Sequence, residues 1–308
     1  TCPAPRGAPV SDQPGLRLVA IASAGPGKVR LDGALRPSIT AALHDAEAGS
    51  VIEIGRGRYG DETETYPLRV PAGVTLRGPT PPDVPSEARK HLPTPQPAEL
   101  VAAGPVIEIA GGDVCLEHLT IRSSRPGESC AVTIGAHRRV GLDTCAVFGS
   151  IDVSGATDTT ISWTTIEHGR LVGRDLTRVT VTGGRITGTH GTDPLVALTD
   201  GSDIRIEATA ITEARVGIAL ASCDEVVVGG CAILADDDAI SADDSRALTL
   251  NGNRLRGRRA VHLDGCTGAE IAANGVEQAD IAFVLATCTG IEVGTNHLAE
   301  VRIAVSES

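Results

Sequence analysis

The sequence predicts an all-β fold, a single-stranded parallel β-helix of about 10 to 12 coils that begins with a short capping helix. Three observations predict it: a repeat of about 22 residues, aliphatic positions two residues apart within each repeat, and an amphipathic segment before the first repeat. Apolar positions that recur at such a period are typical of solenoids, in which each repeat forms one turn.

The chain is expected to form one domain, because no change in composition marks a second one. The opening residues predict a lead-in with one strand near Leu16 to Ala22, and the run from Pro37 to Leu43 predicts the amphipathic capping helix. A proline-rich stretch from Pro79 to Pro97 predicts a loop that leaves the early coils. The expected division of the single domain 1–308 is 1–36 for the lead-in, 37–48 for the capping helix, 49–300 for the coils and 301–308 for the tail.

One aliphatic position recurs along the chain and aligns the repeats, with steps of about 22 residues between its members. The positions five and seven residues before each member are also aliphatic, with one polar exception. The residues between those two positions are mostly polar, which is the alternation of a strand with one buried face. The aligned positions are Ile121, Val147, Ile166, Ile186, Ile211, Ile233, Leu255, Val276 and Leu298.

A second strand is expected after each aligned position, with inward pairs such as Val261 and Leu263. Two residues before the aligned position, the last three repeats carry Asn253, Asn274 and Asn296. Asparagine tolerates a left-handed backbone and can hydrogen-bond a neighbour in a turn. These residues therefore predict a repeated tight corner.

The capping segment is followed by four short runs of strand-forming residues, Gly49–Ile54, Gly55–Tyr59, Tyr66–Val70 and Gly73–Gly78. This order resembles the opening of the pectin-lyase-like, right-handed parallel β-helix superfamily, and of a bacterial β-helix domain family of unknown function within it. Together with the repeats, the resemblance covers residues 37–300 and implies a right-handed helix of parallel strands. It implies much less about a reaction.

The formal net charge is −12 and no basic run is present, which argues against nucleic acid and anionic membranes as partners. No apolar run approaches the roughly 18 residues of a membrane span. The resemblance implies a small molecule or an oligosaccharide substrate as the partner. The negative charge also weighs against a polyanionic glycan, unless Ca²⁺ bridges the charges. The oligomeric state stays open.

The eight cysteines are expected to be mostly small buried side chains. Cys223, Cys266 and Cys288 share one position of the repeat, whereas Cys145 and Cys231 share another but lie four coils, about 19 Å, apart, too far to bond. No Cys-x-x-Cys pair predicts a metal site. Unpaired cysteines indicate a reducing compartment such as the cytoplasm, whereas the resemblance implies secretion, and the sequence leaves both open.

The first candidate site is a trough between two longer coils, whose extra residues at 122–130 and 187–194 flank the two shortest coils. A histidine, carboxylates and arginines that converge there could abstract a proton and stabilise charge, and a merely solvated face is the alternative. By resemblance to pectate-lyase-like enzymes, Arg170 or Arg174 would take the proton. The catalytic candidates are His168, Arg170, Arg174, Asp152, His190 and Asp193, and the substrate-binding candidates are Glu167, Asp175, Arg125, Glu128 and Trp163.

The second candidate site lies where an aspartate-rich run meets the next coil. If Ile240 aligns with Val261, neighbouring coils about 4.8 Å apart stack a serine on a histidine and one aspartate on another. That spacing suits a carboxylate pair that acts as acid and as base or nucleophile, or an oxygen-lined Ca²⁺ site. Turn formation with neutralisation by Arg258 and Arg259 is the alternative. The candidate residues are Asp238, Ser241, Asp243, His262 and Asp264.

Two functions stay open. The resemblance implies a carbohydrate-active protein, such as a lyase or epimerase that acts on a uronide or another small glycan in a surface groove. Aromatic residues make up only 2% of the chain, which weighs against a long series of sugar-binding subsites. That scarcity favours the alternative, a non-catalytic β-helix that binds a partner or has a structural role. Ca²⁺ is the candidate cofactor, and the metal requirement stays open.

Overall fold

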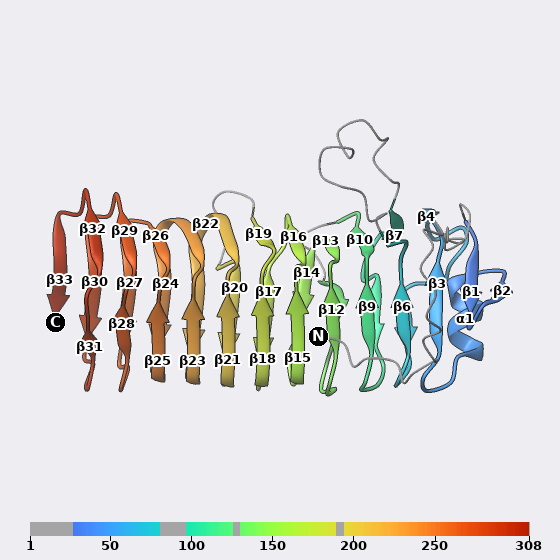
Figure 1. Ribbon diagram of the computed structural model, residues 1–308, viewed down its shortest axis with the longest axis horizontal. Coiled ribbons are helices and arrows are strands. Elements are labelled where there is room, and N and C mark those ends of the chain that lie inside the picture. The colour runs from blue at the N-terminus through green and yellow to red at the C-terminus, as the bar shows by residue number, and fades with distance from the viewer. Residues whose placement is uncertain (1–26, 81–96, 126–129, 189–193, 308) are drawn as a thin grey trace, which may run out of the picture.

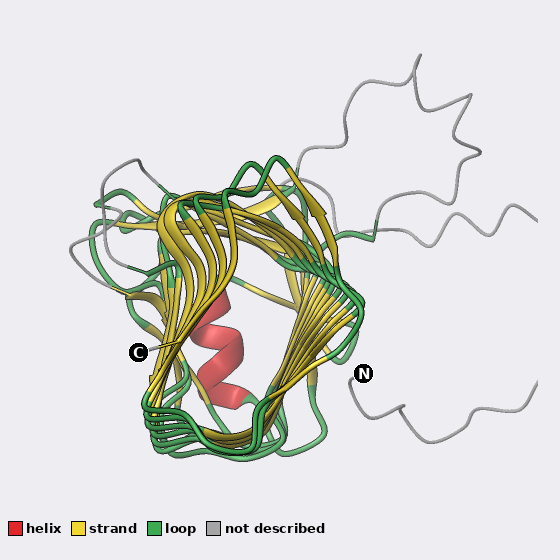
Figure 2. Cartoon of the chain, turned by 90° about the vertical axis from the view of Figure 1, so that its left-hand side faces the viewer, coloured by secondary structure: helices red, strands yellow, loops and turns green. Residues whose placement is uncertain are grey.

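The protein is a parallel β-helix of about 11 turns (Figure 1). The computed structural model describes residues 27–80, 97–125, 130–188 and 194–307. Seen along the long axis, the strands of successive coils superimpose around a common interior, with helix α1 (Ile39–Asp45) at the far end (Figure 2). The predicted fold class, a parallel β-helix with a short N-terminal helix, is confirmed.

Each coil contributes strands to two sheets. A 13-stranded sheet forms the first ladder, and a 20-stranded sheet holds the second and third ladders, because β22 (Ala210–Ala221) and β24 (Ala232–Asp243) each run from the second into the third. The first corner of a coil separates its first and second ladders, and the second corner separates the second and third. The third corner leads into the next coil.

The first ladder consists of β2 (Ala34–Arg36), β1 (Val29–Leu31), β3 (Val51–Ile54), β6 (Thr75–Arg77), β9 (Cys115–Glu117), β12 (Gly141–Asp143), β15 (Thr157–Ser162), β18 (Thr177–Thr182), β21 (Ser202–Glu207), β23 (Asp224–Gly229), β25 (Arg246–Asn251), β28 (Glu270–Ala272) and β31 (Glu292–Val293). The second ladder consists of β4 (Gly57–Tyr59), β7 (Ala98–Ala102), β10 (Leu119–Ser123), β13 (Ala146–Phe148), β16 (Thr165–Glu167), β19 (Arg185–Thr187), the first parts of β22 and β24, β26 (Arg254–Arg256), β29 (Gly275–Glu277) and β32 (His297–Ala299). The third ladder consists of β5 (Leu68–Val70), β8 (Ile107–Ile109), β11 (Cys130–Thr133), β14 (Ser150–Asp152), β17 (Leu171–Arg174), β20 (Val196–Thr199), the last parts of β22 and β24, β27 (Arg259–Asp264), β30 (Ile281–Ala286) and β33 (Ile303–Glu307).

The aligned aliphatic row is a continuous line of paired residues in the second ladder. Ile121 pairs with Val147, and the pairing continues from coil to coil as far as Leu298. Every member except Leu298 is at most 1% exposed. Burying one aliphatic side chain is worth about 1.5–3 kcal/mol, so this row and its neighbours stabilise the stack. The predicted register of the repeats is confirmed.

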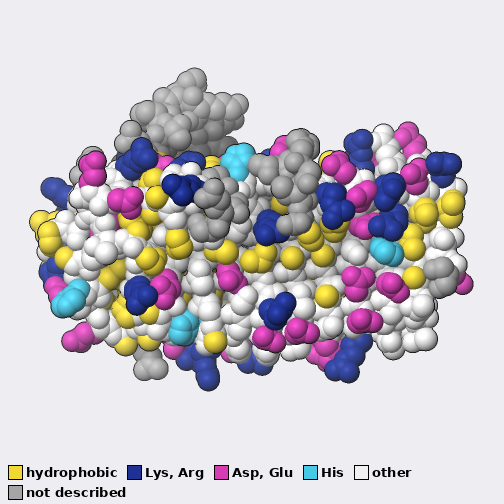
Figure 3. Space-filling view, turned by 180° about the vertical axis from the view of Figure 1, so that it is seen from behind, with side chains coloured by type: hydrophobic (Ala, Val, Ile, Leu, Met, Phe, Trp, Pro, Cys, Tyr) yellow, Lys and Arg dark blue, Asp and Glu magenta, His cyan; other side chains and the backbone are white. Residues whose placement is uncertain are grey.

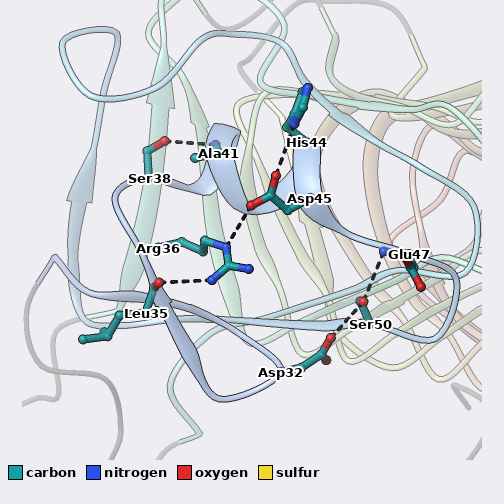
Figure 4. Close-up of polar contacts among 9 residues, drawn as sticks. All are labelled: Asp32, Leu35, Arg36, Ser38, Ala41, His44, Asp45, Glu47 and Ser50. Atoms are coloured by element: carbon teal, nitrogen blue, oxygen red, sulfur yellow. Dashed lines mark hydrogen bonds and ion pairs between the residues drawn. The ribbon is translucent and has the colours of Figure 1, made fainter.

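Helix α1 closes the N-terminal end of the stack. Ser38 precedes it, and its Oγ accepts a hydrogen bond at 3.0 Å from a backbone N–H in the first turn (Figure 4). Buried Glu64 accepts bonds from the backbone N–H groups of Ile39 and Thr40, at 2.9 and 2.7 Å. Together these groups satisfy N–H donors that a helix start leaves free. No helix within the described ranges is long and apolar enough to cross a membrane.

The boundaries differ from the expected ones at both ends. Helix α1 is shorter than the expected range 37–48, and part of the expected tail forms β33, which pairs in parallel with β30. Its side chains are mostly exposed because no further coil of the described chain covers them, so the buried pattern of the repeat is missing there. The strand expected at 16–22 and residues 81–96 of the expected loop lie outside the described residues.

The C-terminal end differs from the N-terminal end. In the described part of the chain no helix covers the last coil, and Val293, Leu298, Ile303 and Val305 are 37–49% exposed. Six cysteines in the described ranges are free, and Cys145, Cys223, Cys231 and Cys266 are buried, as expected for small side chains that fill the stack.

Rows of small polar side chains line the corners from inside. At the first corner the amide of Asn274 accepts bonds from the backbone N and the Nδ2 of Asn253, both at 3.0 Å, and donates to the Leu250 carbonyl at 2.8 Å. The asparagines bond their neighbours at a repeated corner, as predicted, but the left-handed residue of the corner stands one position before Asn253 and before Asn274. The left-handed positions are Gly252, with φ 63°, and Ala273, with φ 56°. The asparagines face inward instead, where they satisfy backbone groups. The row comprises Cys145, Thr164, Thr209, Cys231, Asn253, Asn274 and Asn296.

Candidate functional site

The trough candidates lie at three different corners of neighbouring coils. Glu167 ends β16, and His168 occupies the following second corner as an exposed residue with φ 54°. Arg170 precedes β17, whereas Arg174 ends it and Asp175 begins the third corner. Four residues of strand span about 13 Å, so the candidates at the start of β17, such as Arg170, and those at its end, such as Arg174, do not meet at one point. Their catalytic roles stay predictions.

Three trough side chains do lie near one another at the start of the third ladder. Burial raises the pKa of the Cys130 thiol, the carboxylate of Asp152 raises it further, and the Arg170 guanidinium lowers it. Asp152 Oδ1 accepts bonds from the N and Oγ of Ser154, at 2.9 and 2.6 Å. The carboxylate is therefore already engaged with its own corner, which gives it a structural role in the turn.

Trp163 lies at the first corner, with 66% of its surface exposed. Its ring covers Gly183 of the next coil, where an added Cβ would come within 2.7 Å of the indole. Glycine at this position therefore leaves room for a flat aromatic surface. The expected wall residues Glu128, His190 and Asp193 lie outside the described residues. Arg125 lies next to one of these gaps, and its backbone N donates to Ser123 Oγ at 3.4 Å.

The second candidate cluster has the predicted register. In the third ladder Ile240 pairs with Val261, Ser241 with His262, and Asp243 with Asp264. Because strand side chains alternate, Ser241, His262 and the two aspartates face outward while their neighbours fill the core. Four of the five candidates thus lie on one outer surface formed by two adjacent coils.

Asp238, the fifth candidate, is buried at the second corner beside this surface. Its two carboxylate oxygens accept hydrogen bonds from Arg259 Nε and an Arg259 terminal nitrogen, at 2.5 and 2.7 Å. The side chain of Asp238 is only 6% exposed, and His262 Nδ1 lies 3.9 Å from its Oδ2. Planar two-point pairing is the strongest form of an arginine–carboxylate contact. Arg259 therefore neutralises Asp238 and fixes it next to His262.

The paired aspartates differ in their surroundings. Partial burial raises the pKa of the Asp243 carboxyl; His262 opposes the rise, and the carboxylates of Asp264 and Asp244 add to it. Asp264 instead accepts a hydrogen bond from Thr287 Oγ1 at 2.7 Å. Two neighbouring carboxyl groups in unlike environments are the arrangement from which an acid and a base arise.

A shallow depression of about 540 Å³ lies along the second corner next to this cluster. Four successive coils line it, with Glu213, Leu234, Arg256 and Gln278 contributing one from each. None of these four residues was predicted from the sequence, although their spacing of about 22 residues at outward positions is a signal of the same kind as the buried rows. Acidic and basic side chains are intermixed on the C-terminal half of the face in Figure 3.

Three arginines at this corner are engaged with carboxylates. Asp237 lies between Arg215 and Arg258, at 3.2 and 3.3 Å, and Arg259 is held by Asp238. In the described ranges no group of three or more histidine, cysteine, aspartate or glutamate side chains could hold a metal ion. The suggestion of Ca²⁺ therefore stays a prediction.

Family models match two parts of the chain. Residues 34–120 match a family described as protein of unknown function (DUF1565), and residues 150–307, just over half of the chain, match one described as periplasmic copper-binding protein (NosD). No curated protein matches the chain.

Solved structures with a similar fold include enzymes and an adhesin. The A-module of mannuronan C-5 epimerase AlgE6 from Azotobacter vinelandii has 12% identity and a TM-score of 0.53, covering 87% of this chain and 90% of its own. The AlgE4 A-module from the same organism has 12% identity and a TM-score of 0.47, covering 82% and 87%. The surface adhesin PfbA of Streptococcus pneumoniae has 10% identity and a TM-score of 0.44, covering 83% and 74%. At such identities the likeness is one of fold. Because the match over residues 150–307 covers just over half of the chain, the chain belongs to the family described as periplasmic copper-binding protein (NosD).

Proposed function

We propose that this protein binds a small uncharged glycan on the outer surface of β24 and β27 and cleaves a glycosidic bond there. The observation that carries the proposal is the pairing of Asp243 with Asp264 across adjacent coils, next to His262. Asp243, whose pKa is raised, protonates the leaving oxygen while Asp264 attacks the anomeric carbon as nucleophile. Water then hydrolyses the glycosyl–Asp264 ester, with Asp243 taking the proton of the water. His262, held beside buried Asp238, hydrogen-bonds a sugar hydroxyl.

The charges around the pair favour an uncharged glycan over a uronide. Asp238, Asp243, Asp244 and Asp264 surround the surface, and the nearby cations Arg258 and Arg259 already pair with carboxylates. A lyase or epimerase needs a positive group to neutralise the carboxylate of its uronide, and Ca²⁺ would have to supply it. Copper, which the family description names, has no part in this proposed function.

Asp243→Asn should lower the rate of glycosidic cleavage by about 10²–10⁴-fold, because the amide cannot donate the proton. The measurement is the release of reducing ends from a panel of neutral oligosaccharides, with oligouronides plus Ca²⁺ as the comparison panel. Asp280→Asn is the matched control, since Asp280 is an exposed carboxylate that pairs with Arg302 at 3.2 Å. Because neighbouring coils are about 4.8 Å apart, close to the separation in retaining enzymes, the product should keep its anomeric configuration.

Equal activity in Asp243→Asn and in the wild type would overturn the acid–base assignment. Binding of a neutral glycan without turnover, seen as a rise in melting temperature, would leave the non-catalytic binding module as the function. Cleavage of oligouronides alone would replace the uncharged substrate by a charged one.

The pH dependence offers a second test, through a residue outside the reacting pair. The negative charge of Asp244 raises the pKa of Asp243, so Asp244→Asn should lower that pKa. An acid must be protonated to act, so the activity falls as the pH rises through its pKa. The basic limb of the rate profile should therefore move to lower pH in Asp244→Asn, with the maximal rate kept. Asparagine tolerates the left-handed backbone of this position, where φ is 48°. A shift to higher pH would contradict the assignment of Asp243 as the acid.

A further inference from the structure

Ser241, His262 and Asp238 bring a hydroxyl, an imidazole and a buried carboxylate together on the third ladder. Ser241 pairs with His262 across two adjacent coils, so their Cα atoms are about 4.8 Å apart and both side chains face outward. Asp238 lies in the coil of Ser241, three residues earlier, and its side chain is 6% exposed. Its Oδ2 is 3.9 Å from His262 Nδ1, so the imidazole extends toward the coil that holds the other two groups.

The surroundings of His262 determine which of its nitrogens can act as a base. The Asp238 carboxylate lies on the Nδ1 side of the ring and is itself held by two hydrogen bonds from Arg259. A carboxylate beside Nδ1 favours the neutral tautomer in which Nδ1 carries the proton, and Nε2 then keeps a lone pair. The side chain of His262 is 22% exposed, so the ring can contact a bound molecule. His262 is therefore suited to take a proton through Nε2.

The Ser241 hydroxyl is available for reaction. It is half-buried, and no other described residue forms a hydrogen bond with it. Catalytic hydrogen bonds are often long in an unliganded enzyme and shorten when the substrate binds, so this hydroxyl is free to turn to His262. On its other side Ser241 pairs with Ala219, whose methyl group leaves space for a short acyl chain.

The guanidinium of Arg259 completes the group with a positive charge. It donates to Asp238 through Nε and one terminal nitrogen, which leaves its other terminal nitrogen to donate elsewhere. The side chain of Arg259 is 29% exposed, so it lies at the edge of the outer surface. The carbonyl oxygen of an ester becomes negative when a nucleophile attacks, and a fixed donor beside that oxygen lowers the barrier.

We propose that Ser241 is a nucleophile that cleaves short-chain carboxylic esters, with His262 as its base and Asp238 as the residue that positions His262. Ser241 Oγ bonds to the acyl carbon while its proton moves to His262 Nε2. The ester C–O bond then breaks, and the alcohol leaves with that proton. Water attacks the acyl group in turn, its proton passes through His262 to Ser241 Oγ, and the carboxylic acid is released. This reaction does not rest on glycosidic cleavage.

The test follows two reactions of the full-length chain, labelling by a fluorophosphonate and hydrolysis of p-nitrophenyl acetate. A fluorophosphonate reacts covalently with activated serines, and mass spectrometry should find the label on Ser241. Ser241→Ala should abolish this label and lower the rate of hydrolysis by more than about 100-fold. His262→Gln should lower both rates by about 10²–10⁴-fold, the usual contribution of a general base. The reporter ester has no glycosidic bond, so the result is independent of the function proposed above.

Asp238→Asn tests the positioning role. The amide can hold the ring in the wrong tautomer, so kcat should fall by about 10²–10⁴-fold while KM is unchanged. The labelled fraction at long times should equal that of the wild type, because the nucleophile is still present. A lower labelled fraction with an unchanged kcat per labelled chain would mean that Asp238 only supports the fold, and would overturn its positioning role.

Ser306 is the matched control serine. It stands in the same outward row, in β33, but the residue paired with it is Val284 in place of a histidine. Ser306→Ala should therefore change neither rate, and circular dichroism checks that each variant is folded. Label on other residues with none on Ser241, or equal loss in Ser306→Ala, would overturn the proposal. Full hydrolysis in Ser241→Ala with loss in His262→Gln would mean that the histidine attacks the ester directly, and would exclude Ser241 as the nucleophile.

Discussion

Arg259→Met should lower the free energy of unfolding by about 3–5 kcal/mol, because it leaves the buried carboxylate of Asp238 without its partner. Asp238 is 5% exposed, and both its oxygens bond to the Arg259 guanidinium. His262 Nδ1, at 3.9 Å, is too far away to replace the lost hydrogen bonds. The measurement is the midpoint and slope of chemical denaturation at neutral pH, compared between the wild type and the variant.

Two further variants isolate the cause. Arg259→Met with Asp238→Asn removes the buried charge as well and should recover most of the loss, since cutting one partner of a buried pair costs more than replacing both. Arg254→Met is the matched control. Arg254 pairs with Glu277 at 2.9 Å, but its side chain is 71% exposed, so the loss should stay below about 1 kcal/mol. Equal destabilisation by the single and the double variants at the second corner would show that packing and not charge explains the loss.

Asn274→Ala should be the most destabilising substitution in the first-corner row, by about 3–6 kcal/mol. It removes the acceptor of the backbone N and of one Nδ2 hydrogen of Asn253, and a donor to the carbonyl of Leu250, whereas Asn253 Nδ2 keeps its bond to the Val228 carbonyl at 2.8 Å. Both asparagines are 1% exposed, so little water reaches these groups, and each unsatisfied buried group costs about 1–3 kcal/mol. Thermal or chemical denaturation monitored by circular dichroism measures the loss.

Asn274→Thr is the matched control, because this row already holds threonine in two earlier coils. There Thr164 Oγ1 donates to the Ser162 carbonyl at 3.0 Å and accepts a bond from the Cys145 backbone at 3.4 Å. Threonine should therefore recover part of the stability that alanine loses. Similar losses for the two variants would mean that side-chain volume, and not hydrogen bonding, sets the stability of this corner.

Most of the fold could be predicted from the sequence because it rests on rows that repeat. The pairing of Ile121 with Val147 follows from spacing alone, and so does the register of Ser241 with His262. The inward position of the asparagines could not be read in this way. A repeated Asn at a corner suits either a left-handed residue or a buried amide, and only the placement of Gly252 at φ 63° separates the two.

The candidate sites were harder to predict because spacing places residues along the coil but not around it. His168 and Arg174 lie on neighbouring corners of one coil. They are six residues apart in the sequence, and this separation fits two residues on one surface as well as two residues on separate corners. The pair Asp243 and Asp264 could be predicted because both residues belong to aligned rows. Arg215 was missed because its bond to Asp237 crosses from one coil to the next at a corner, where the strand period ends.

Because a helix caps one end and the rows repeat in phase along the stack, the number of coils can change while the architecture stays the same. Each coil rests on the coil before it, and stability accumulates along the series through contacts between neighbours. A repeat of about 22 residues can therefore be gained or lost by duplication or deletion without rebuilding the interior, provided that the corner rows stay in phase. A pair of coils such as those of Asp243 and Asp264 can then diverge in its outward residues while the remaining coils keep the frame that presents them.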